Sequence, residues 1–212
     1  MIIAVDGPAA SGKGTLAAGL AQHYRLPCLD TGLLYRAVGR AVSGLEDAPD
    51  FEARAIAAAQ NLKQDDIDPE ALVSAGVGVL ASKVAVIAGV RQALFDYQRD
   101  FAAQPGGAVL DGRDIGTVIA PHADVKLFIR TDSKVRMERR ARQLEKRGEA
   151  VDRYALYHQI EERDARDMAN PNGGFYKAED AHLLDTTLLD IEASLRAAIA
   201  IVDGTMARKA GL

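Results

Sequence analysis

The chain has 212 residues, 48% of them hydrophobic and 26% charged, which fits a globular protein with one main domain, a sizeable core and a small appendage. A net charge of −4 argues against nonspecific nucleic-acid binding, and the lack of an apolar run of ~18 residues argues against a membrane span. The one cysteine, Cys28, excludes an intramolecular disulfide and fits a reducing compartment. We therefore expect a cytoplasmic protein without an export signal, in which Cys28 is a small buried hydrophobe beside a strand.

Short apolar runs alternate with helical patterns along the chain. The sequence predicts strands at 1–5, 26–30, 107–111, 125–129 and 182–186. It predicts helices at about 14–24, 32–43, 51–62, 78–104, 133–147, 151–167 and 190–209. This alternation indicates an α/β fold, a parallel sheet covered by helices on both faces, with a ligand at the carboxyl ends of the strands. The first three strands end at carboxylates, which are Asp6, Asp30 and Asp111.

A glycine-rich loop follows the first strand. The spacing of Gly7, Gly12 and Lys13 fits the phosphate-binding P-loop, G-x-x-x-x-G-K-[ST], but Gly14 stands where a hydroxyl residue is expected and Thr15 comes one position late. Such a loop directs backbone N–H groups, the positive end of a helix dipole and a lysine ammonium toward one phosphate. An ordinary strand-to-helix turn would not account for the spacing, the lysine and the flanking elements together.

Two segments interrupt the alternation. Residues 44–76 are acidic and rich in turn residues, and we interpret them as part of a small substrate-side subdomain. Residues 148–175 contain a charged helix followed by "NPNGGF", and we interpret them as part of a mobile lid. Composition alone favours ordinary solvated helices and loops for both segments.

Charged residues follow the second strand. Thr31 and Gly32 can form a tight turn that opens a helix carrying Arg36 toward the P-loop cleft. An N-cap followed by an exposed arginine explains this stretch equally well.

The third strand ends in a denser cluster, in which Asp111, Arg113 and Asp114 lie beside glycines. Burying mixed charges is costly unless they are paired or meet a charged ligand. An arginine can grip a phosphate through two hydrogen bonds, and an aspartate can accept one from the amino group of a base. The alternative is a self-satisfied Arg–Asp cluster, and the nearby P-loop favours the functional interpretation.

A basic helix is expected at 134–148. Arg136, Arg139 and Arg140 lie on neighbouring faces of it, without aromatic residues for stacking nucleic-acid bases. A solvated basic face is the usual explanation, and the sharper one is a lid that neutralises triphosphate charge. The charged run at 161–167, with Arg163 and Asp167, can point into the same cleft. The histidines show no metal-ligand spacing.

Several stretches together resemble the bacterial cytidylate kinases, a family of nucleoside monophosphate kinases. They run in family order and read "DGPAASGKGT" (6–15), "LDTGLLYR" (29–36), "SKVAVIAGVRQAL" (82–94), "DGRDIGTVIAP" (111–121), "ERDARD" (162–167) and "AEDAHLLDTT" (178–187). The family's P-loop also reads G-K-G-T, in agreement with Gly14 and Thr15. The resemblance implies a P-loop three-layer fold with a five-stranded parallel sheet flanked by helices, plus small acceptor-binding and lid segments.

The resemblance also implies the site residues. The catalytic group would be Lys13, Asp111, Arg113 and Arg163. ATP would bind to Gly7, Pro8, Ala9, Ala10, Ser11, Gly12, Lys13, Gly14, Thr15, Arg136, Arg139 and Arg140. CMP would bind to Thr31, Arg36, Ser82, Arg91, Arg113, Asp114, Arg163 and Asp167, with Thr31, Arg91 and Asp114 reading the cytosine edge. Mg²⁺ would be held mostly by nucleotide phosphates and waters, with Asp111 supporting those waters and no direct protein ligand.

Two departures from the family pattern stand out. The acceptor-side segment 44–76 has no strand-rich stretch, so the small β insert of the family is expected to be reduced. The region 168–180 reads "MANPNGGFYKAED", with Asn170 about where the family has an arginine and Lys177 as a conceivable substitute. This difference bears on the preference between ribose and deoxyribose.

The resemblance therefore implies an ATP:(d)CMP phosphotransferase of pyrimidine nucleotide metabolism. It would be a single domain, 1–212, with a core of about 1–43, 77–147 and 176–212, an acceptor-side segment of about 44–76 and a lid of about 148–175. We expect a monomer with small-molecule substrates and neither nucleic-acid nor membrane partners. The rival functions are a P-loop kinase for another acceptor, a GTP-hydrolysing switch, and a nucleic-acid-binding module. The switch is disfavoured because N-K-x-D and D-x-x-G are both absent from the sequence.

Overall fold

The structure, a computed structural model, describes residues 1–63, 66–69, 71–72, 75–170 and 175–211. The segments expected at 44–76 and 148–175 lie partly outside these residues. So does the middle of the "MANPNGGFYKAED" stretch, at 171–174.

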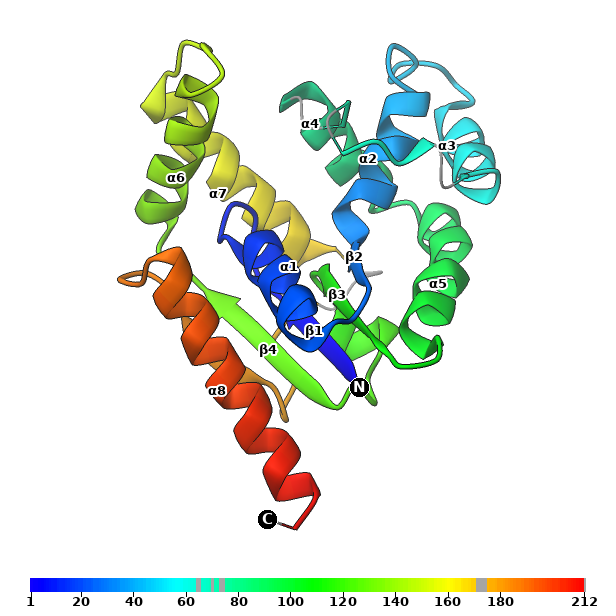
Figure 1. The fold of residues 1–212 in the computed structure, drawn as a ribbon. Helices are drawn as coiled ribbons and strands as arrows, with labels where there is room; N and C mark the ends of the chain where they lie inside the picture. The colour runs from blue at the N-terminus through cyan, green and yellow to red at the C-terminus, as the bar shows by residue number, and fades with distance from the viewer. Residues whose placement is uncertain (64–65, 70, 73–74, 171–174, 212) are drawn as a thin grey trace.

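A parallel sheet forms the centre of the fold (Figure 1). Its five strands, counted over the described residues, are β1 (Ile2–Asp6), β2 (Cys28–Asp30), β3 (Ala108–Gly112), β4 (Val125–Arg130) and β5 (His182–Asp185), in the order β2-β3-β1-β4-β5. The central strands β1 and β3 consist largely of buried, mostly apolar residues, as expected for a sheet covered on both faces. The predicted fold class is confirmed, and each strand lies within about two residues of its predicted position.

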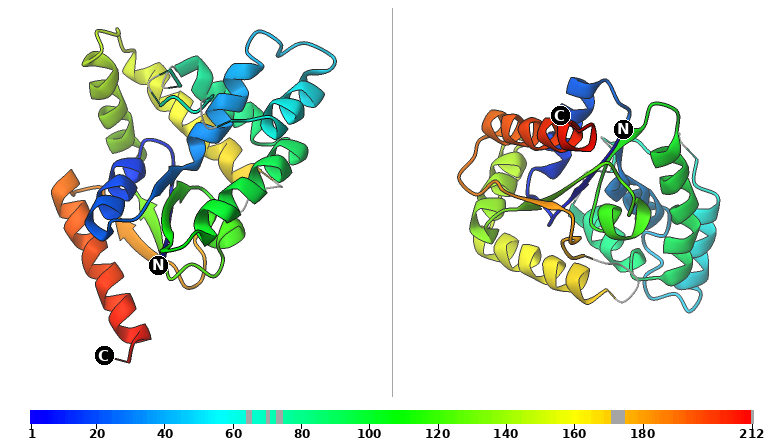
Figure 2. Two further views of the ribbon diagram at one scale, coloured as in Figure 1. Left: turned by 45° about the vertical axis from the view of Figure 1, so that its right-hand side comes forward. Right: turned by 90° about the horizontal axis from the view of Figure 1, so that it is seen from below.

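Helices cover both faces of the sheet (Figure 2). Alternate residues of β1 enter different cores: Ile3 and Val5 pack with α1 (Lys13–Tyr24) and α8 (Ile191–Lys209), whereas Ala4 packs on the opposite side. That opposite core is built with α2 (Thr31–Ala41), α3 (Phe51–Gln60), α5 (Ala88–Ala103) and the single wide π-helical turn η2 (Ile115–Ile119). The two cores fix the carboxyl edge of the sheet between them.

Two groups of helices rise beyond that edge (Figure 1). One is the pair α6 (Ser133–Glu145) and α7 (Arg153–Ala169), and the other contains α2, α3 and α4 (Ala75–Val84). Aspartate side chains accept hydrogen bonds from the first turns of α2, α6, α7 and α8, which explains where these helices begin. Between 44 and 76, the described residues contain no strand.

The single helix predicted at 78–104 is wrong. It is two helices, α4 and α5, which meet at 96°. Ile87 is extended between them, with φ −77° and ψ 115°. The bend has a packing cause: α4 packs on α2, while α5 approaches α3 so closely that a Cβ on Gly89 would lie 2.5 Å from Ile56 Cδ1. One straight helix could not make both contacts.

The expectation that Cys28 is buried is also wrong, because Cys28 is exposed. It opens β2, which is an edge strand of the sheet, so the alternation that buries Leu29 leaves Cys28 facing outward. Over the described part of the chain, no single helix has the length and hydropathy of a bilayer span. The bent pair α4–α5 reaches that length and composition only when its two helices are counted together.

Candidate active site

The P-loop connects β1 to α1 and forms the floor of the site. Gly12 adopts φ +86°, a left-handed conformation that glycine allows without strain, and α1 begins at the next residue, Lys13. A Cβ on Gly14 would lie 3.0 Å from Oδ2 of Asp111. The departure from the common P-loop pattern at Gly14 therefore has a local reason, since a hydroxyl side chain there would crowd a buried carboxylate.

Lys13 and Asp111 form an ion pair, with Lys13 Nζ 2.9 Å from Asp111 Oδ1. The two side chains are 13% and 2% exposed. Burial lowers the pKa of Lys13, and the Asp111 carboxylate opposes that shift. Burial raises the pKa of Asp111, and the Lys13 ammonium opposes that shift. The pair thus places a lysine ammonium at the mouth of the P-loop with one close carboxylate partner.

Asp6 joins the P-loop strand to the turn that follows β3. Its carboxylate accepts hydrogen bonds from the backbone N–H groups of Ile115, at 2.9 Å, and Gly116, at 2.8 Å. Burial raises the pKa of Asp6 to about 7, although the two backbone hydrogen bonds oppose the shift. The segment carrying Arg113 and Asp114 is therefore tied directly to the base of the P-loop.

A buried Arg91–Asp114 ion pair lies on the acceptor side of the site. Arg91 comes from α5, and Asp114 directly precedes η2. Thr31, the first residue of α2, donates its hydroxyl to the carbonyl oxygen of Asp111 at 2.8 Å. The residues expected to read the cytosine edge thus come from three different elements and line one cavity.

Three arginines, Arg36, Arg113 and Arg163, line the same cavity. Arg113 donates from Nε to Asp167 Oδ2 at 2.8 Å, and Arg36 donates to the Leu72 carbonyl at 2.8 Å. Burial, Arg113 and Arg36 lower the pKa of Arg163 to about 10, whereas Asp167 opposes the shift. Within the described residues, Nε of Arg163 is buried without a hydrogen-bond partner. Because clustered buried cations repel one another, this arrangement favours an anionic ligand.

One cavity brings most of these groups together. Its lining includes the P-loop residues Ala9, Ala10 and Lys13 and all eight expected CMP-binding residues, Thr31, Arg36, Ser82, Arg91, Arg113, Asp114, Arg163 and Asp167. Ser82 is buried there and its hydroxyl donates to the Gly78 carbonyl at 3.3 Å. Asp111 lies directly behind the wall, 2.9 Å from Lys13.

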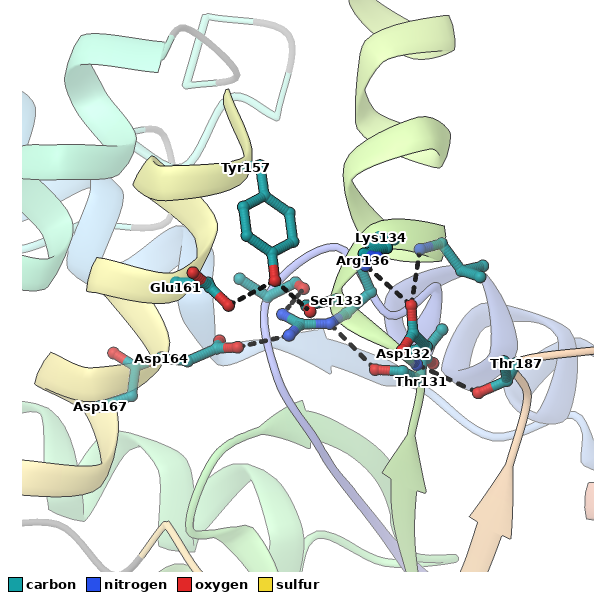
Figure 3. A network of polar contacts seen from close by, with 12 residues as sticks. Thr131, Asp132, Ser133, Lys134, Arg136, Tyr157, Glu161, Asp164, Asp167 and Thr187 are labelled. Atoms are coloured by element: carbon teal, nitrogen blue, oxygen red, sulfur yellow. Dashed lines mark hydrogen bonds and ion pairs between the residues drawn. The ribbon is translucent and has the colours of Figure 1, made fainter. Parts of the chain in front are cut away.

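The three α6 arginines expected to bind ATP lie differently from one another. Arg136 is buried and bonds to protein groups (Figure 3). Arg139 donates to the carbonyls of Ser11 at 3.0 Å, Thr186 at 2.7 Å and Leu189 at 3.1 Å. Arg140 donates to Gln143 at 2.7 Å, and its charge contributes to lowering the pKa of Arg36, after burial. Arg139 thus contacts the P-loop directly, whereas the printed hydrogen bond of Arg140 stays within α6.

Some lining residues were not predicted from the sequence. Asp30 was interpreted only as a strand end, yet it lines the cavity together with Tyr35, Asn170 and Phe175. The Phe175 ring lies with its centroid 6.0 Å from Cζ of Arg113. Asn170 donates to the Ala85 carbonyl at 3.2 Å. A single aromatic in a turn-rich segment carries no local signal of this contact.

Comparisons with known proteins identify the family of the chain. The family model described as cytidylate kinase matches residues 3–203. A cytidylate kinase from Xanthobacter autotrophicus is 55% identical over 211 residues, covering 100% of both chains. One from Nitrobacter winogradskyi is 52% identical over 208 residues, covering 98% of each chain.

A structural comparison supports the fold. The crystal structure of an uncharacterized protein from Eubacterium ventriosum ATCC 27560 has a TM-score of 0.55 and 18% identity to this chain, and covers 96% of this chain and 98% of its own. That similarity concerns the fold alone. The match to the family model and the full-length similarity to two cytidylate kinases confirm the resemblance seen in the sequence, and the chain belongs to the cytidylate kinase family.

Proposed function

We propose that the chain transfers the γ-phosphoryl group of ATP to the 5′-phosphate of CMP or dCMP, giving ADP and CDP or dCDP. The observation that carries the proposal is one cavity lined by the P-loop lysine, three converging arginines and the Arg91–Asp114 pair. Family membership supports the same reaction. The experiment is a coupled assay of ADP release with a panel of nucleoside monophosphates.

On the donor side, the P-loop amides, the first turn of α1 and Lys13 would hold the β- and γ-phosphates. Thr15, in that first turn, would add its hydroxyl. Lys13 is paired with Asp111 at 2.9 Å, so its ammonium must share or exchange this partner when it contacts a phosphate. We propose Arg139 and Arg140 as the further cations of the donor side, because Arg139 donates to the Ser11 carbonyl of the P-loop and Arg140 is the next residue of the same helix.

On the acceptor side, Arg36, Arg113 and Arg163 would hold the phosphate of the monophosphate, with Ser82 and Asp167 near the sugar. Asp114 would accept a hydrogen bond from the exocyclic amine of cytosine, which uracil lacks. Arg91 and Thr31 would fix the position of that base. The attacking phosphate is already anionic, so the protein needs to position it rather than deprotonate it.

The residues fit a reaction assisted by Mg²⁺. Among the described residues, no cluster of three or more His, Cys, Asp or Glu could hold a metal ion, whereas the buried Asp111 carboxylate lies next to the P-loop lysine. This donor set suits an ion carried by the nucleotide phosphates, with Asp111 supporting its waters. When bound, Mg²⁺ would neutralise part of the phosphate charge.

The division into a core, an acceptor-side segment and a lid rests on the sequence pattern, and closure of the lid would exclude water from the phosphoryl group. A monomeric, cytoplasmic enzyme is expected from the sequence. Size-exclusion chromatography with light scattering tests the oligomeric state.

A further inference from the structure

Arg136 makes contacts that its position in a basic helix did not predict (Figure 3). Its side chain is only 5% exposed. Nε donates to the Thr131 carbonyl at 3.1 Å, one terminal nitrogen to the Ala9 carbonyl at 3.1 Å, and the other to Asp164 Oδ2 at 2.5 Å. Each nitrogen of the guanidinium is thus engaged by the protein itself.

The three acceptors belong to different parts of the site. Thr131 directly follows β4, Ala9 lies in the P-loop, and Asp164 lies in α7. Asp164 is the neighbour of Arg163 and one helical turn from Asp167, the two residues that α7 contributes to the acceptor cavity. One side chain therefore contacts the donor loop and the helix that carries acceptor contacts.

The contacts of Arg136 with Thr131, Ala9 and Asp164, called the joint below, suit a rigid connection between α7 and the P-loop. A guanidinium presents its donors in a planar fork, so three acceptors in different directions fix the side chain and one another. Asp164 is the carboxylate partner of this nearly buried cation, and removal of one member of such a pair is strongly unfavourable. A lysine would retain the charge without spanning all three acceptors.

We propose that Arg136 and Asp164 are positioning residues that hold α7 against the P-loop, so that Arg163 and Asp167 meet the acceptor at a fixed place relative to Lys13. This inference rests on the proposed function for its kinetic consequence. It differs from the expectation that Arg136 contacts ATP, because the buried guanidinium acts here through Asp164 and the Ala9 carbonyl.

Asp164→Ala is the most direct test, since it removes the α7 half of the joint and leaves the contacts of Arg136 with the P-loop in place. We expect the KM for CMP to rise about tenfold and kcat to fall about tenfold, because displaced acceptor groups no longer align the phosphates. The Kd for ATP alone, measured by calorimetry, should stay within about twofold of the wild-type value, since α7 supplies no expected donor contact. Asp164→Asn keeps an acceptor oxygen and should recover part of the loss, which also covers the case in which the alanine variant folds poorly.

Arg153→Gln is the matched control. Arg153 also joins α7 to α6, through ion pairs with Glu138 at 3.3 Å and Glu145 at 2.9 Å, but it is about half exposed and its ion-pair partners lie in α6 rather than in the P-loop. Its substitution should change KM, kcat and Kd by less than about twofold, as is usual for an exposed pair.

Hydrogen exchange gives a readout that needs no turnover. Amides near Asp164 in α7 should exchange at least about tenfold faster in Asp164→Ala than in the wild type, and Arg153→Gln should not reproduce this in that part of the helix. If the chain fails to phosphorylate CMP but this exchange difference appears, the joint stands and the proposed function fails. The positioning role would be overturned if amides near Asp164 exchanged at the same rate in Asp164→Ala and Arg153→Gln. It would also be overturned if Asp164→Ala weakened ATP binding and left the KM for CMP unchanged.

Discussion

Nζ of Lys13 lies 2.9 Å from Oδ1 of Asp111, so the lysine of the phosphate-binding loop is paired with a carboxylate at the end of the neighbouring strand β3. Asp111 is buried and Lys13 is only 13% exposed, so neither charge is solvated well by water alone. A phosphate arriving in the P-loop would therefore meet a cation that is already positioned. We propose that the buried carboxylate beside it supports a cation that accompanies the nucleotide.

Lys13→Met should reduce kcat by about 10²–10³-fold, because it removes a full charge from the position where phosphoryl charge develops. The folded state should persist, as judged by circular dichroism at 20 °C. Lys134→Met, at an exposed position of α6, is the control for removing one lysine and should retain activity. Turnover within tenfold of the wild type in Lys13→Met would refute the role given to Lys13.

Asp114→Asn should erode the preference for CMP over UMP. The amide retains a hydrogen-bonding oxygen for Arg91, but it loses the charge that favours the exocyclic amine of cytosine. We expect the ratio of kcat/KM values for CMP and UMP to fall about tenfold or more, as for other sites that recognise a polar group by a buried hydrogen bond. An unchanged ratio would remove Asp114 from base recognition.

Arg163→Gln should raise the KM for CMP by about tenfold or more, because a charge-assisted contact with a phosphate is lost from a nearly buried site. The KM for ATP should change much less. Arg166→Gln removes an arginine from the same helix, where Arg166 lies 3.8 Å from Glu162 and is 42% exposed, and should leave both constants near their wild-type values. Similar effects of the two substitutions would argue against a specific role for Arg163.

The pH dependence of stability should carry a contribution from Asp6. Burial raises its pKa to about 7 from 3.8, so the folded state binds this proton more tightly than the unfolded chain does. The stabilising contribution is therefore complete below the unfolded pKa and is lost as pH rises through about 7, with a slope of at most about 1.4 kcal/mol per pH unit.

Comparison with Asp6→Asn isolates that contribution, since asparagine does not titrate. Thermal unfolding of both proteins from pH 5 to pH 8 should show the wild type losing stability relative to the variant as pH rises. Parallel profiles over this range would contradict the raised pKa of Asp6.

The fold could be predicted from the sequence because it depends on local patterns, whereas most of the cavity residues were predicted through the resemblance to the cytidylate kinases. Apolar runs at regular spacing gave the strands, and the carboxylates at their ends marked the edge where Asp111 and Asp114 lie. The bend between α4 and α5 could not be predicted, since it depends on how closely Gly89 approaches Ile56. Cys28 is exposed on β2, which is an edge strand. The order of the strands in the sheet, and hence which strand lies at the edge, cannot be read from local sequence patterns.

The contacts of Arg136 escaped prediction for a different reason. Two of its three acceptors are backbone carbonyls, at Ala9 and Thr131, and any residue type can supply a carbonyl. A basic helix therefore gives the same sequence signal whether its arginines face a ligand or tie the structure together. Only the three-dimensional arrangement separates Arg136 from Arg140.

The most direct test of the function is to measure which nucleoside monophosphate accepts the phosphoryl group. ADP release should be followed with ATP and Mg²⁺ in parallel wells containing CMP, dCMP, UMP, AMP, GMP or dTMP, with the Lys13→Met variant as the blank. We expect strong turnover with CMP or dCMP, and at least about tenfold higher kcat/KM for the better of these than for UMP, because cytosine offers an exocyclic amine to Asp114 and uracil does not. Absence of turnover with both cytidine nucleotides, in a protein that still binds ATP, would contradict phosphoryl transfer to CMP or dCMP.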